Sequence, residues 1–549
     1  MVQIVSLNKS ARMSAKRIIL VIFLLTGISS VIMAQLKNDY ASNWKKVDGF
    51  EKKGLTKSAQ AEVTAIYKLA QAESNDVQQV KACIYLIRYR DMVQEDSREN
   101  NIFYVDTLIA GAKAPARNIL QSMQAGMFWQ YLQNNRWTFY NRTKLAQEKS
   151  KDITTWSIDK LYATISKLYK ASLGNEVLLK NTRLDGLDAI LIKGENTRQL
   201  RPTLFDFLAH RALEFFMNDE NGVIKPAYQF RMDDAGAFAK AEDFVRTGFK
   251  TKDTASLQYK ALLVLQDILR FHLADANPDA LIDADLIRLS FVYNNSILEE
   301  KGKLYEHALL SIEQKYPGSP AAAQAAYLRG SLYLSRGKEY EPYTRTENQF
   351  EIKRAKELFE SVYSKFPKSE GGINAKNAAM QIEQPSLGME TEKVNTPLQA
   401  FRSLVKYKNV NKIHLRVIKT SREEIRKFDR KDYDQLWRSY TALKPLKSWS
   451  MALPDAQDYQ LHSAEIKIDG LANGIYLILA SMDENFSLEK NIITKQLTYV
   501  SNISYIHTSN NQYYVLNRDN GTPLSKAQVQ LWESRYNQRR TLASLSTAC

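Results

Sequence analysis

The spacing of apolar residues in this sequence changes once, and that change limits what the chain can fold into. Over residues 38–383 the apolar residues recur at helical spacing, as Val63 and Ile66 do, which predicts amphipathic helices. In the last part of the chain they alternate, as Ile413 and Leu415 do, which is typical of strands with one buried face. We therefore expect a multidomain α-then-β chain, with an all-helical region followed by an antiparallel β-sandwich.

The helical region nearly repeats itself. The segment HALLSIEQKYPGSPAAAQAAYLRGSLYL is followed by AKELFESVYSKFPKSEGGINAKNAAMQI, with the two Pro breaks fifty residues apart. In both segments an amphipathic helix ends at an aromatic-Pro pair, Tyr316-Pro317 or Phe366-Pro367, and an Ala-rich helix follows. This pattern resembles tetratricopeptide-type helical pairs, whose period is about 34 residues. An insertion at residues 337–348 accounts for the longer spacing, and we expect a stacked array of helical pairs.

The N-terminus has the three parts of an export signal. Four basic residues precede the apolar run IILVIFLLTGISSVIM, which ends at the small residue Ala34. The run is shorter than the roughly 20 apolar residues of a membrane span, so we expect cleavage before Gln35, with an uncleaved anchor as the alternative. Translation from Met13 would give a more compact signal. The expected location is the periplasm or cell envelope of a Gram-negative-type bacterium, with membrane contact only through the signal before cleavage.

A change in composition separates the helical and β regions. The segment QPSLGMETEKVNTP at residues 384–397 has the Pro, Gly and polar content of a linker, which predicts a protease-sensitive joint. The expected organisation is a signal peptide at 1–34, a helical-repeat region at 35–383, a linker at 384–397, a β-sandwich at 398–505 and an incomplete second β-domain at 506–549.

Several further segments of the β region read as strands. Ala464, Ile466 and Ile468 alternate, and GIYLILASM and KQLTYVSNISYI follow with the same period. The segment YDQLWRSYTAL, within residues 432–443, has helical spacing instead, which predicts a helix inserted between strands.

The stretch YYVLNRDNGTPLSKAQVQLWES predicts a β-hairpin near the end of the chain. Its two apolar runs flank Asp519-Asn520-Gly521, residues that tolerate the positive φ of a tight turn. The following RYNQRRTLASLSTAC shows no clear alternation. A lone hairpin cannot bury an apolar face, so we expect the chain to be the front portion of a longer protein, cut inside its second β-domain.

The sequence indicates no catalytic, cofactor-binding or metal site. The histidines are scattered and lack partners at metal-ligand spacing; they are His210, His272, His307, His414, His462 and His507. His210 and Glu214 stand four apart, which predicts a surface contact. Ser157 and Lys160 fit a Ser-x-x-Lys pattern, but its companion motifs are missing. Cys83 lies among apolar residues and is expected to be a small core residue.

The charge of the chain does not indicate a nucleic-acid partner. The formal net charge is +16, of which the four basic residues before the apolar run supply four. Elsewhere the basic residues stand in mixed runs such as SREEIRKFDRKDYD. A solvated surface fits this distribution better than a basic nucleic-acid site.

The β region is similar to the first macroglobulin-type domains of bacterial alpha-2-macroglobulin-like proteins. The segments that carry the resemblance are FRSLVKYKNVNKIHLRVIK, LANGIYLILAS and the Asn-Gly-x-Pro-Leu hairpin, within about residues 390–535. The resemblance implies a role in trapping proteases, which cut a bait segment and are enclosed, in many members with acylation by a Cys-Gly-Glu-Gln thioester. The pairs Glu313-Gln314 and Glu383-Gln384 lack the cysteine that this motif needs, so no functional residue transfers.

The sequence thus predicts an exported, non-enzymatic protein whose implied partners are proteases, bound through regions absent here. The alternative is a helical-repeat scaffold that binds a cell-envelope protein partner. A third reading, an exported peptidase, lacks a recognisable site.

Overall fold

The computed structural model describes residues 40–93, 97–140, 151–194, 197–218, 228–510, 512–535 and 538–547. The chain divides into two compact units, Met1–Ala321 and Ala322–Cys549. The predicted signal peptide at 1–34 lies outside the described residues. Within the described ranges, no helix combines the length and the apolar character needed to cross a membrane.

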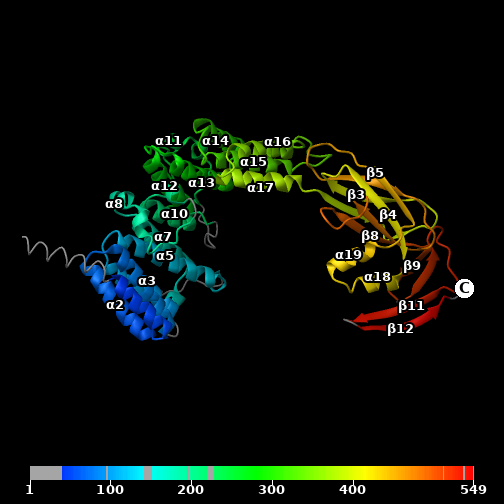
Figure 1. Ribbon diagram of the computed structural model, residues 1–549, viewed down its shortest axis with the longest axis horizontal. Helices are drawn as coiled ribbons and strands as arrows, with labels where there is room; N and C mark the ends of the chain where they lie inside the picture. Colours follow the sequence, from blue (N-terminus) through cyan, green and yellow to red (C-terminus); the bar gives the residue numbers. More distant parts are fainter. Residues whose placement is uncertain are drawn as a thin grey trace, which may run out of the picture. The chain divides into compact units, whose positions relative to one another are not determined.

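The first unit is built of helices (Figure 1). Residues 40–52 are helical, and the later elements are α2 (Thr56–Ala72), α3 (Asp76–Val93), α4 (Ser97–Ala110), α5 (Ala116–Asn134), α6 (Arg136–Tyr140), η1 (Ile153–Thr155), α7 (Ile158–Ser172), α8 (Glu176–Asn181), η2 (Leu184–Leu187), α9 (Thr197–Leu200), α10 (Leu204–Phe216), η3 (Ala235–Phe238), α11 (Ala241–Phe244), α12 (Leu257–His272), α13 (Asp279–Asn295) and α14 (Lys301–Lys315).

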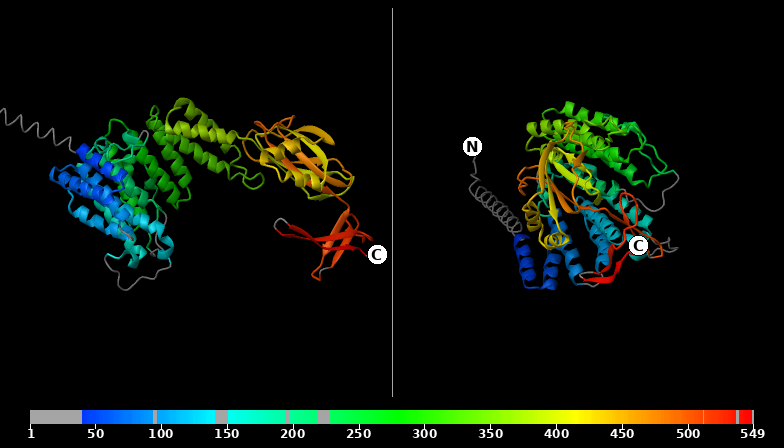
Figure 2. Two further views of the ribbon diagram at one scale, coloured as in Figure 1. Left: turned by 60° about the horizontal axis from the view of Figure 1, so that its bottom comes forward. Right: turned by 90° about the vertical axis from the view of Figure 1, so that its right-hand side faces the viewer.

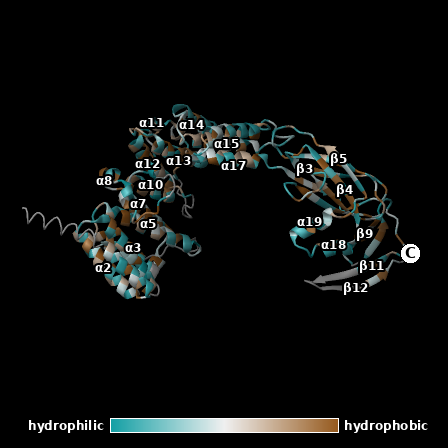
Figure 3. Cartoon of the chain, viewed as in Figure 1, coloured by the Kyte–Doolittle hydropathy of each residue, from teal (hydrophilic) through white to brown (hydrophobic). Residues whose placement is uncertain are grey.

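The first helices follow the apolar pattern of the sequence. Val63 and Ile66 of α2 are fully buried, in one cluster with Trp44 and Val47 of the preceding helix. The break between the two helices lies at Gly54, whose φ of 68° few residues other than glycine adopt easily. Hydrophilic and hydrophobic residues accordingly alternate around α2 and α3 in Figure 3. The helical spacing predicted for this region is confirmed.

The two aromatic-Pro breaks have the same local geometry. α14 ends before Tyr316, with φ and ψ of −126° and 55°, and α16 (Glu351–Lys365) ends before Phe366, with −130° and 59°. In both, the backbone N–H of the serine three residues on donates to the aromatic residue's carbonyl at 3.1 Å. This likeness supports the predicted repeat, and the predicted insertion lies in the non-helical residues 338–350.

The second unit combines helices with two packed sheets (Figure 2). Its helices are α15 (Ala323–Gly337), α16, α17 (Glu370–Glu383), α18 (Arg422–Phe428) and α19 (Tyr433–Thr441). Its strands are β1 (Ser386–Thr391), β2 (Val394–Asn395), β3 (Phe401–Lys408), β4 (Lys412–Thr420), β5 (Lys447–Ala452), β6 (His462–Ile468), β7 (Gly474–Ser481), β8 (Ile493–Val500), β9 (Ile503–His507), β10 (Tyr513–Asn517), β11 (Gln528–Arg535) and β12 (Gln538–Ser546).

The sandwich has a three-stranded and a five-stranded sheet. Their orders are β1-β3-β6 and β2-β8-β7-β4-β5, antiparallel except for the short β2–β8 pair. Residues from both sheets, among them Val405, Leu415 and Ile478, form one buried core. The outer face of β7 is also covered, because Leu477 and Leu479 form a second cluster with Tyr440 of α19. The predicted α-then-β fold and the predicted helical insert are confirmed.

The predicted linker at 384–397 is wrong. β1 pairs with β3 along its whole length, with Leu387 opposite Tyr407 and Met389 opposite Val405. Met389 is buried in the sandwich core, and β2 adds to the other sheet. The polar content of this segment is that of an edge strand, since only one side of β1 is paired. A protease-sensitive joint is therefore not expected there.

A buried polar joint binds the helices of the second unit to the sandwich. The Asp458 carboxylate, 1% exposed, accepts hydrogen bonds from the Gln349 side-chain amide at 2.9 Å and from His462 Nε2 at 2.8 Å. The Gln460 side-chain amide donates to the carbonyls of Gly337 and Gln349, at 2.8 and 3.2 Å. Between them Tyr459 packs against the core of α15, α16 and α17. The insertion at 338–350 is thus the part of the helical repeat that meets the sandwich.

The predicted terminal hairpin is confirmed only next to its turn, where Val515, Leu516 and Asn517 pair with Leu524, Pro523 and Thr522. The turn closes with Asn517 N–H donating to the Thr522 carbonyl at 2.8 Å, and Gly521 has a φ of 72°. The flanking strands do not pair with each other along their length: β10 pairs with β9, and β11 pairs with β12. Residues 538–546, expected to be irregular, form β12. Period-2 patterning predicted strands but not their partners.

We expect Gly371→Ala to destabilise the second unit. Gly371 lies where α17 starts against α15, and a Cβ there would stand 2.4 Å from the backbone carbon of Ala323. Backbone displacement of this kind costs about 1–3 kcal/mol, which outweighs the better helix propensity of alanine, about 1 kcal/mol. Urea unfolding followed by circular dichroism measures the change. The matched control is Gly49→Ala, with no atom within 4 Å, for which unchanged or higher stability is expected.

We expect Gln460→Ala to weaken the joint. The substitution leaves two carbonyls without their side-chain donor at a site where Gln460 itself is 7% exposed. Loss of a buried partner costs about 1–3 kcal/mol, measured as a lower urea midpoint of the second unit. Gln399→Ala, at an exposed position in the same unit, is the control. Equal midpoints for the two variants would contradict the role given to Gln460.

Candidate functional site

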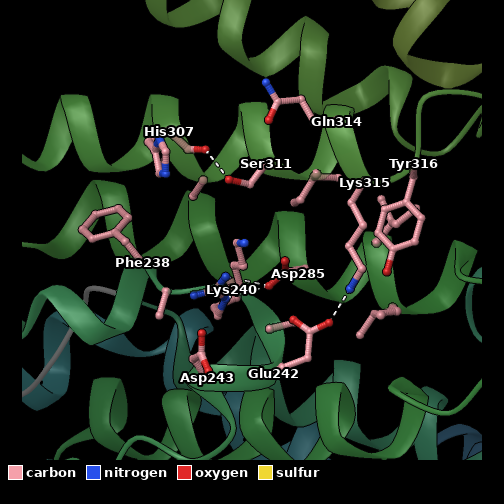
Figure 4. A pocket seen from close by; sticks show the side chains of 17 residues that line it. Phe238, Lys240, Glu242, Asp243, Asp285, His307, Ser311, Gln314, Lys315 and Tyr316 are labelled. Carbon is pink, nitrogen blue, oxygen red and sulfur yellow. Dashed lines mark hydrogen bonds and ion pairs between the residues drawn. The ribbon is translucent and has the colours of Figure 1, made fainter.

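A cavity in the first unit is the candidate site. It has a volume of about 560 Å³ and lies among the segment from η3 to α11 and the helices α13 and α14. Figure 4 shows its lining residues, with Asp285 and Glu242 near its middle and His307 and Tyr316 toward its sides. A volume of this size is typical of small-molecule or peptide-residue sites.

The walls of the cavity are largely apolar. They are formed by Phe238, Ala241, Leu281, Ile282, Ala308 and Ile312. The buried positions of α14 recur at helical spacing, because this helix presents one apolar face to the unit's interior, whereas α13 is buried on most sides. The short α11 supplies Glu242 and Asp243 in its first turn, where negative charge is favourable beside the exposed N–H groups.

A buried ion pair lies within the cavity lining. Arg288 is 0% exposed. Its Nε and Nη2 both approach Asp285 Oδ1, at 2.8 and 2.7 Å. Its Nη1 donates to the Ala237 carbonyl, and its guanidinium lies 4.5 Å from the centre of the Phe244 ring. These contacts hold the arginine fully inside the protein, where an unpaired charge would be costly.

The second oxygen of Asp285 is left available. No donor in the described part of the chain reaches Oδ2, although the Asp285 side chain is only 8% exposed. Burial raises the pKa of Asp285, against the lowering effect of the Arg288 charge and hydrogen bond. Oδ2 is not among the fully buried polar atoms that lack a hydrogen-bond partner in the described residues, so it is the oxygen of the paired carboxylate that faces the cavity.

The rim carries a second ion pair and several exposed polar groups. Lys315 at the end of α14 is paired with Glu242 (Figure 4), and its hydrogen bond lowers the pKa of Glu242. Lys240 and Asp243 are exposed at the rim. The Ser311 hydroxyl donates to the backbone carbonyl of His307 at 2.9 Å, and the His307 side chain lines the cavity.

The sequence signals that resembled chemistry serve structural roles. The Ser157 hydroxyl accepts the Lys160 N–H at 3.3 Å and caps α7, so this Ser-x-x-Lys is an N-cap. Cys83 is fully buried, as expected, and burial raises the pKa of its thiol to about 12. The predicted surface contact of His210 with Glu214 is wrong. His210 is buried, and its Nδ1 lies 2.8 Å from the Asp206 carbonyl while Glu214 is exposed.

An Asp-His-Asp arrangement around the buried His272 could not be read from the sequence. His272 Nε2 lies 2.8 Å from Asp206 Oδ1, and its Nδ1 lies 2.6 Å from Asp275 Oδ2. Asp206 also accepts from the backbone N–H of Thr203 in a capping box at the start of α10. The two aspartates are 66 and three residues from His272, so only the fold brings the distant one near. Within the described ranges, no group of three or more such side chains could hold a metal ion.

The two buried histidines are expected to give opposite pH dependences. Burial alone would lower the pKa of His272, but hydrogen bonds and charges from Asp206 and Asp275 raise it. The stabilisation that protonated His272 gives the fold is thus fully present below its pKa in the unfolded chain, about 6.5. It is lost as the pH rises through the higher pKa that His272 has in the folded protein. Burial and the Arg201 charge lower the pKa of His210 to about 4. As the pH falls from about 6.5 toward 4, the unfolded chain binds a proton at His210 while the folded protein does not, so the free energy of unfolding decreases.

We accordingly expect His272→Gln to be more destabilising at about pH 5.5 than at about pH 9. His210→Gln should show the reverse trend, because it removes a group that resists protonation. Urea unfolding of both variants at the two pH values measures this. Parallel pH profiles for the two variants would contradict the opposite shifts.

Comparison with known proteins gives weak structural likeness alone. No protein-family model and no curated protein matches the sequence. Among solved structures, native alpha-2-macroglobulin from Escherichia coli, in a fragment spanning domains MG0-NIE-MG1, is similar with a TM-score of 0.22 and 16% sequence identity. The match covers 30% of this chain and 57% of that chain, so the chain spans little more than half of it. A likeness this weak does not place the chain in a family.

Proposed function

We propose that this chain is an exported, non-enzymatic protein that forms the N-terminal part of an alpha-2-macroglobulin-like protease trap. The observation that carries the proposal is where the resembling residues lie. FRSLVKYK and KIHLRVIKT are β3 and β4, and GIYLILAS is β7, the strand covered on both faces. The segments that resemble macroglobulin-type domains therefore form the core of the sandwich.

The strands beyond the sandwich support a continuing series of β-modules. β9 and β10 form a two-stranded sheet, and Ile503, Tyr505 and Ile506 are each more than half exposed. Two strands alone cannot bury an apolar face, so further strands would cover these side chains in a longer polypeptide. On this proposal the bait segment and any thioester lie there, because this chain has no Cys-Gly-Glu-Gln sequence.

The non-enzymatic assignment rests on how the reactive side chains are used. His272 is held between two aspartates, and Ser157 caps a helix. Each of these groups contributes to the fold through contacts that would have to break for it to act as a base or nucleophile.

The alternative is a helical scaffold that binds a cell-envelope protein, with the sandwich as a spacer. The cavity among η3, α11, α13 and α14 favours it, because it offers a largely apolar site on the helical part of the chain. A scaffold of this kind needs no bait or thioester.

The trap proposal is tested on the polypeptide isolated from its own cells. An antibody against residues 398–505 should recover a polypeptide larger than 62.9 kDa that begins at Gln35. Incubated with a protease, it should protect large protein substrates while cleavage of small peptide substrates continues. The 549-residue chain expressed alone should not protect them. A recovered polypeptide that leaves cleavage of large substrates unchanged would contradict the trap and favour the scaffold.

A further inference from the structure

Two Asn-Gly pairs of the β region, Asn473-Gly474 and Asn520-Gly521, have the residue types that let a backbone nitrogen attack a side-chain amide. Glycine has no side chain to shield its nitrogen, so the carbon of the preceding amide can come close to it. A third pair, at 221–222, lies outside the described residues. The two described pairs share one dipeptide in different surroundings, so the fold decides which of them can react.

The Asn520-Gly521 pair lies in an exposed turn. Both residues are exposed, and Gly521 has a φ of 72° with open space within 4 Å of where a Cβ would be. Water and solvent base can therefore reach its nitrogen. The Gly521 N–H donates to the Asn517 carbonyl at 2.9 Å, and this bond has to open before the nitrogen attacks. As a bond of an exposed turn, it opens far more readily than the bonds of a core strand.

The Asn520 side chain is already folded over the peptide that would attack it. Its Oδ1 accepts hydrogen bonds from the Thr522 backbone N–H at 3.0 Å and from the Thr522 hydroxyl at 2.8 Å. A side-chain oxygen that reaches the residue two positions on lies across the intervening peptide, which contains the Gly521 nitrogen. Both bonds also stabilise the negative charge that develops on Oδ1 when the amide carbon is attacked.

The Asn473-Gly474 pair has different surroundings. Gly474 is the first residue of β7 and stands opposite Val500 of β8, within the five-stranded sheet. No side-chain hydrogen bond in the described ranges holds Asn473 over Gly474. Attack by the Gly474 nitrogen would require the start of a central strand to leave the sheet.

We propose that Asn520 is a site of spontaneous deamidation, with water as the only reactant consumed. Solvent base removes the Gly521 amide proton, and the nitrogen forms a bond to Cγ of Asn520. The Cγ–Nδ2 bond breaks, and Nδ2 leaves as ammonia with the proton that the base removed. Water then opens the cyclic imide at either carbonyl, which gives aspartate or isoaspartate. The inference concerns the turn alone and holds whether or not the chain belongs to a protease trap.

The reaction changes the turn between β10 and β11. The imide nitrogen carries no proton, so the hydrogen bond from Gly521 to the Asn517 carbonyl is lost. Isoaspartate routes the backbone through the side-chain carbons and lengthens the turn, and either product adds a negative charge. The pairing next to the turn, in which the Leu524 N–H donates to the Val515 carbonyl at 2.9 Å, should therefore weaken as the protein ages.

Peptide mapping of the whole chain tests the proposal. The chain is incubated in mildly alkaline buffer, and mass spectrometry follows the converted fraction of Asn520 and of Asn473 over time. Asn520 should convert at least about tenfold faster than Asn473, because the backbone of a core strand opens rarely. Its products should include isoaspartate, which direct hydrolysis of the side-chain amide cannot form. Equal rates at the two positions, or aspartate without isoaspartate, would overturn the proposal.

The same incubation in concentrated urea shows whether the fold makes the difference. Unfolding exposes both Asn-Gly pairs to solvent, so the rates at Asn520 and Asn473 should converge. A rate difference that persists in urea would mean that the neighbouring residues, and not the turn, select Asn520. The structural basis of the proposal would then be wrong.

A variant of the attacking residue tests the chemical step. Gly521→Ala places a methyl group beside the attacking nitrogen, at a position with open space around it. It should slow the conversion of Asn520 severalfold and leave that of Asn473 unchanged. The matched control is Ser525→Ala, at an exposed position beyond the turn, which should leave both rates unchanged. Conversion of Asn520 as fast in Gly521→Ala as in the wild-type chain would exclude attack by this nitrogen.

Discussion

The buried carboxylate of Asp458 holds the second unit together. It accepts hydrogen bonds from Gln349, from His462 and from the backbone of Gln460, and Gln460 in turn donates to two carbonyls of the helical region. Such a network stabilises a unique arrangement only when its members are satisfied together. The helices α15, α16 and α17 and the sandwich share this joint and the adjoining Tyr459 contact. The boundary between the compact units therefore falls near residue 321, in the middle of the helical repeat.

Local features of the fold could be predicted from the sequence, and pairings could not. The period of the apolar residues correctly located α2, β4, β6 and β7, because one face of each is buried. The partner of a strand depends on residues far along the chain. β1 was read as a linker because its alternation, Leu387 and Met389, is short and lies among polar residues. β10 pairs with β9 although the Asn-Gly turn leads directly toward β11.

The candidate site was missed for a related reason. Its lining comes from three separate segments, and Asp285 and Arg288 look in sequence like an ordinary surface pair three residues apart on a helix. One signal was available: DALIDADLIRLSFVY is apolar on most sides, so charged residues in its middle must be buried and paired. The same reasoning applies to His272, whose partner Asp206 is 66 residues away. Most polar groups with buried side chains serve the fold, as the Asp285–Arg288 pair does.

The central structural claim is that α16, α17 and the sandwich form one cooperative body. Hydrogen–deuterium exchange of the wild-type chain tests it most directly, because amides that open together share one free energy of opening. We expect the protected amides of α16, β1 and β3 to exchange with a common free energy and to respond together to low concentrations of denaturant. Exchange of α16 and α17 through a separate opening of lower free energy, with the sandwich still protected, would contradict it.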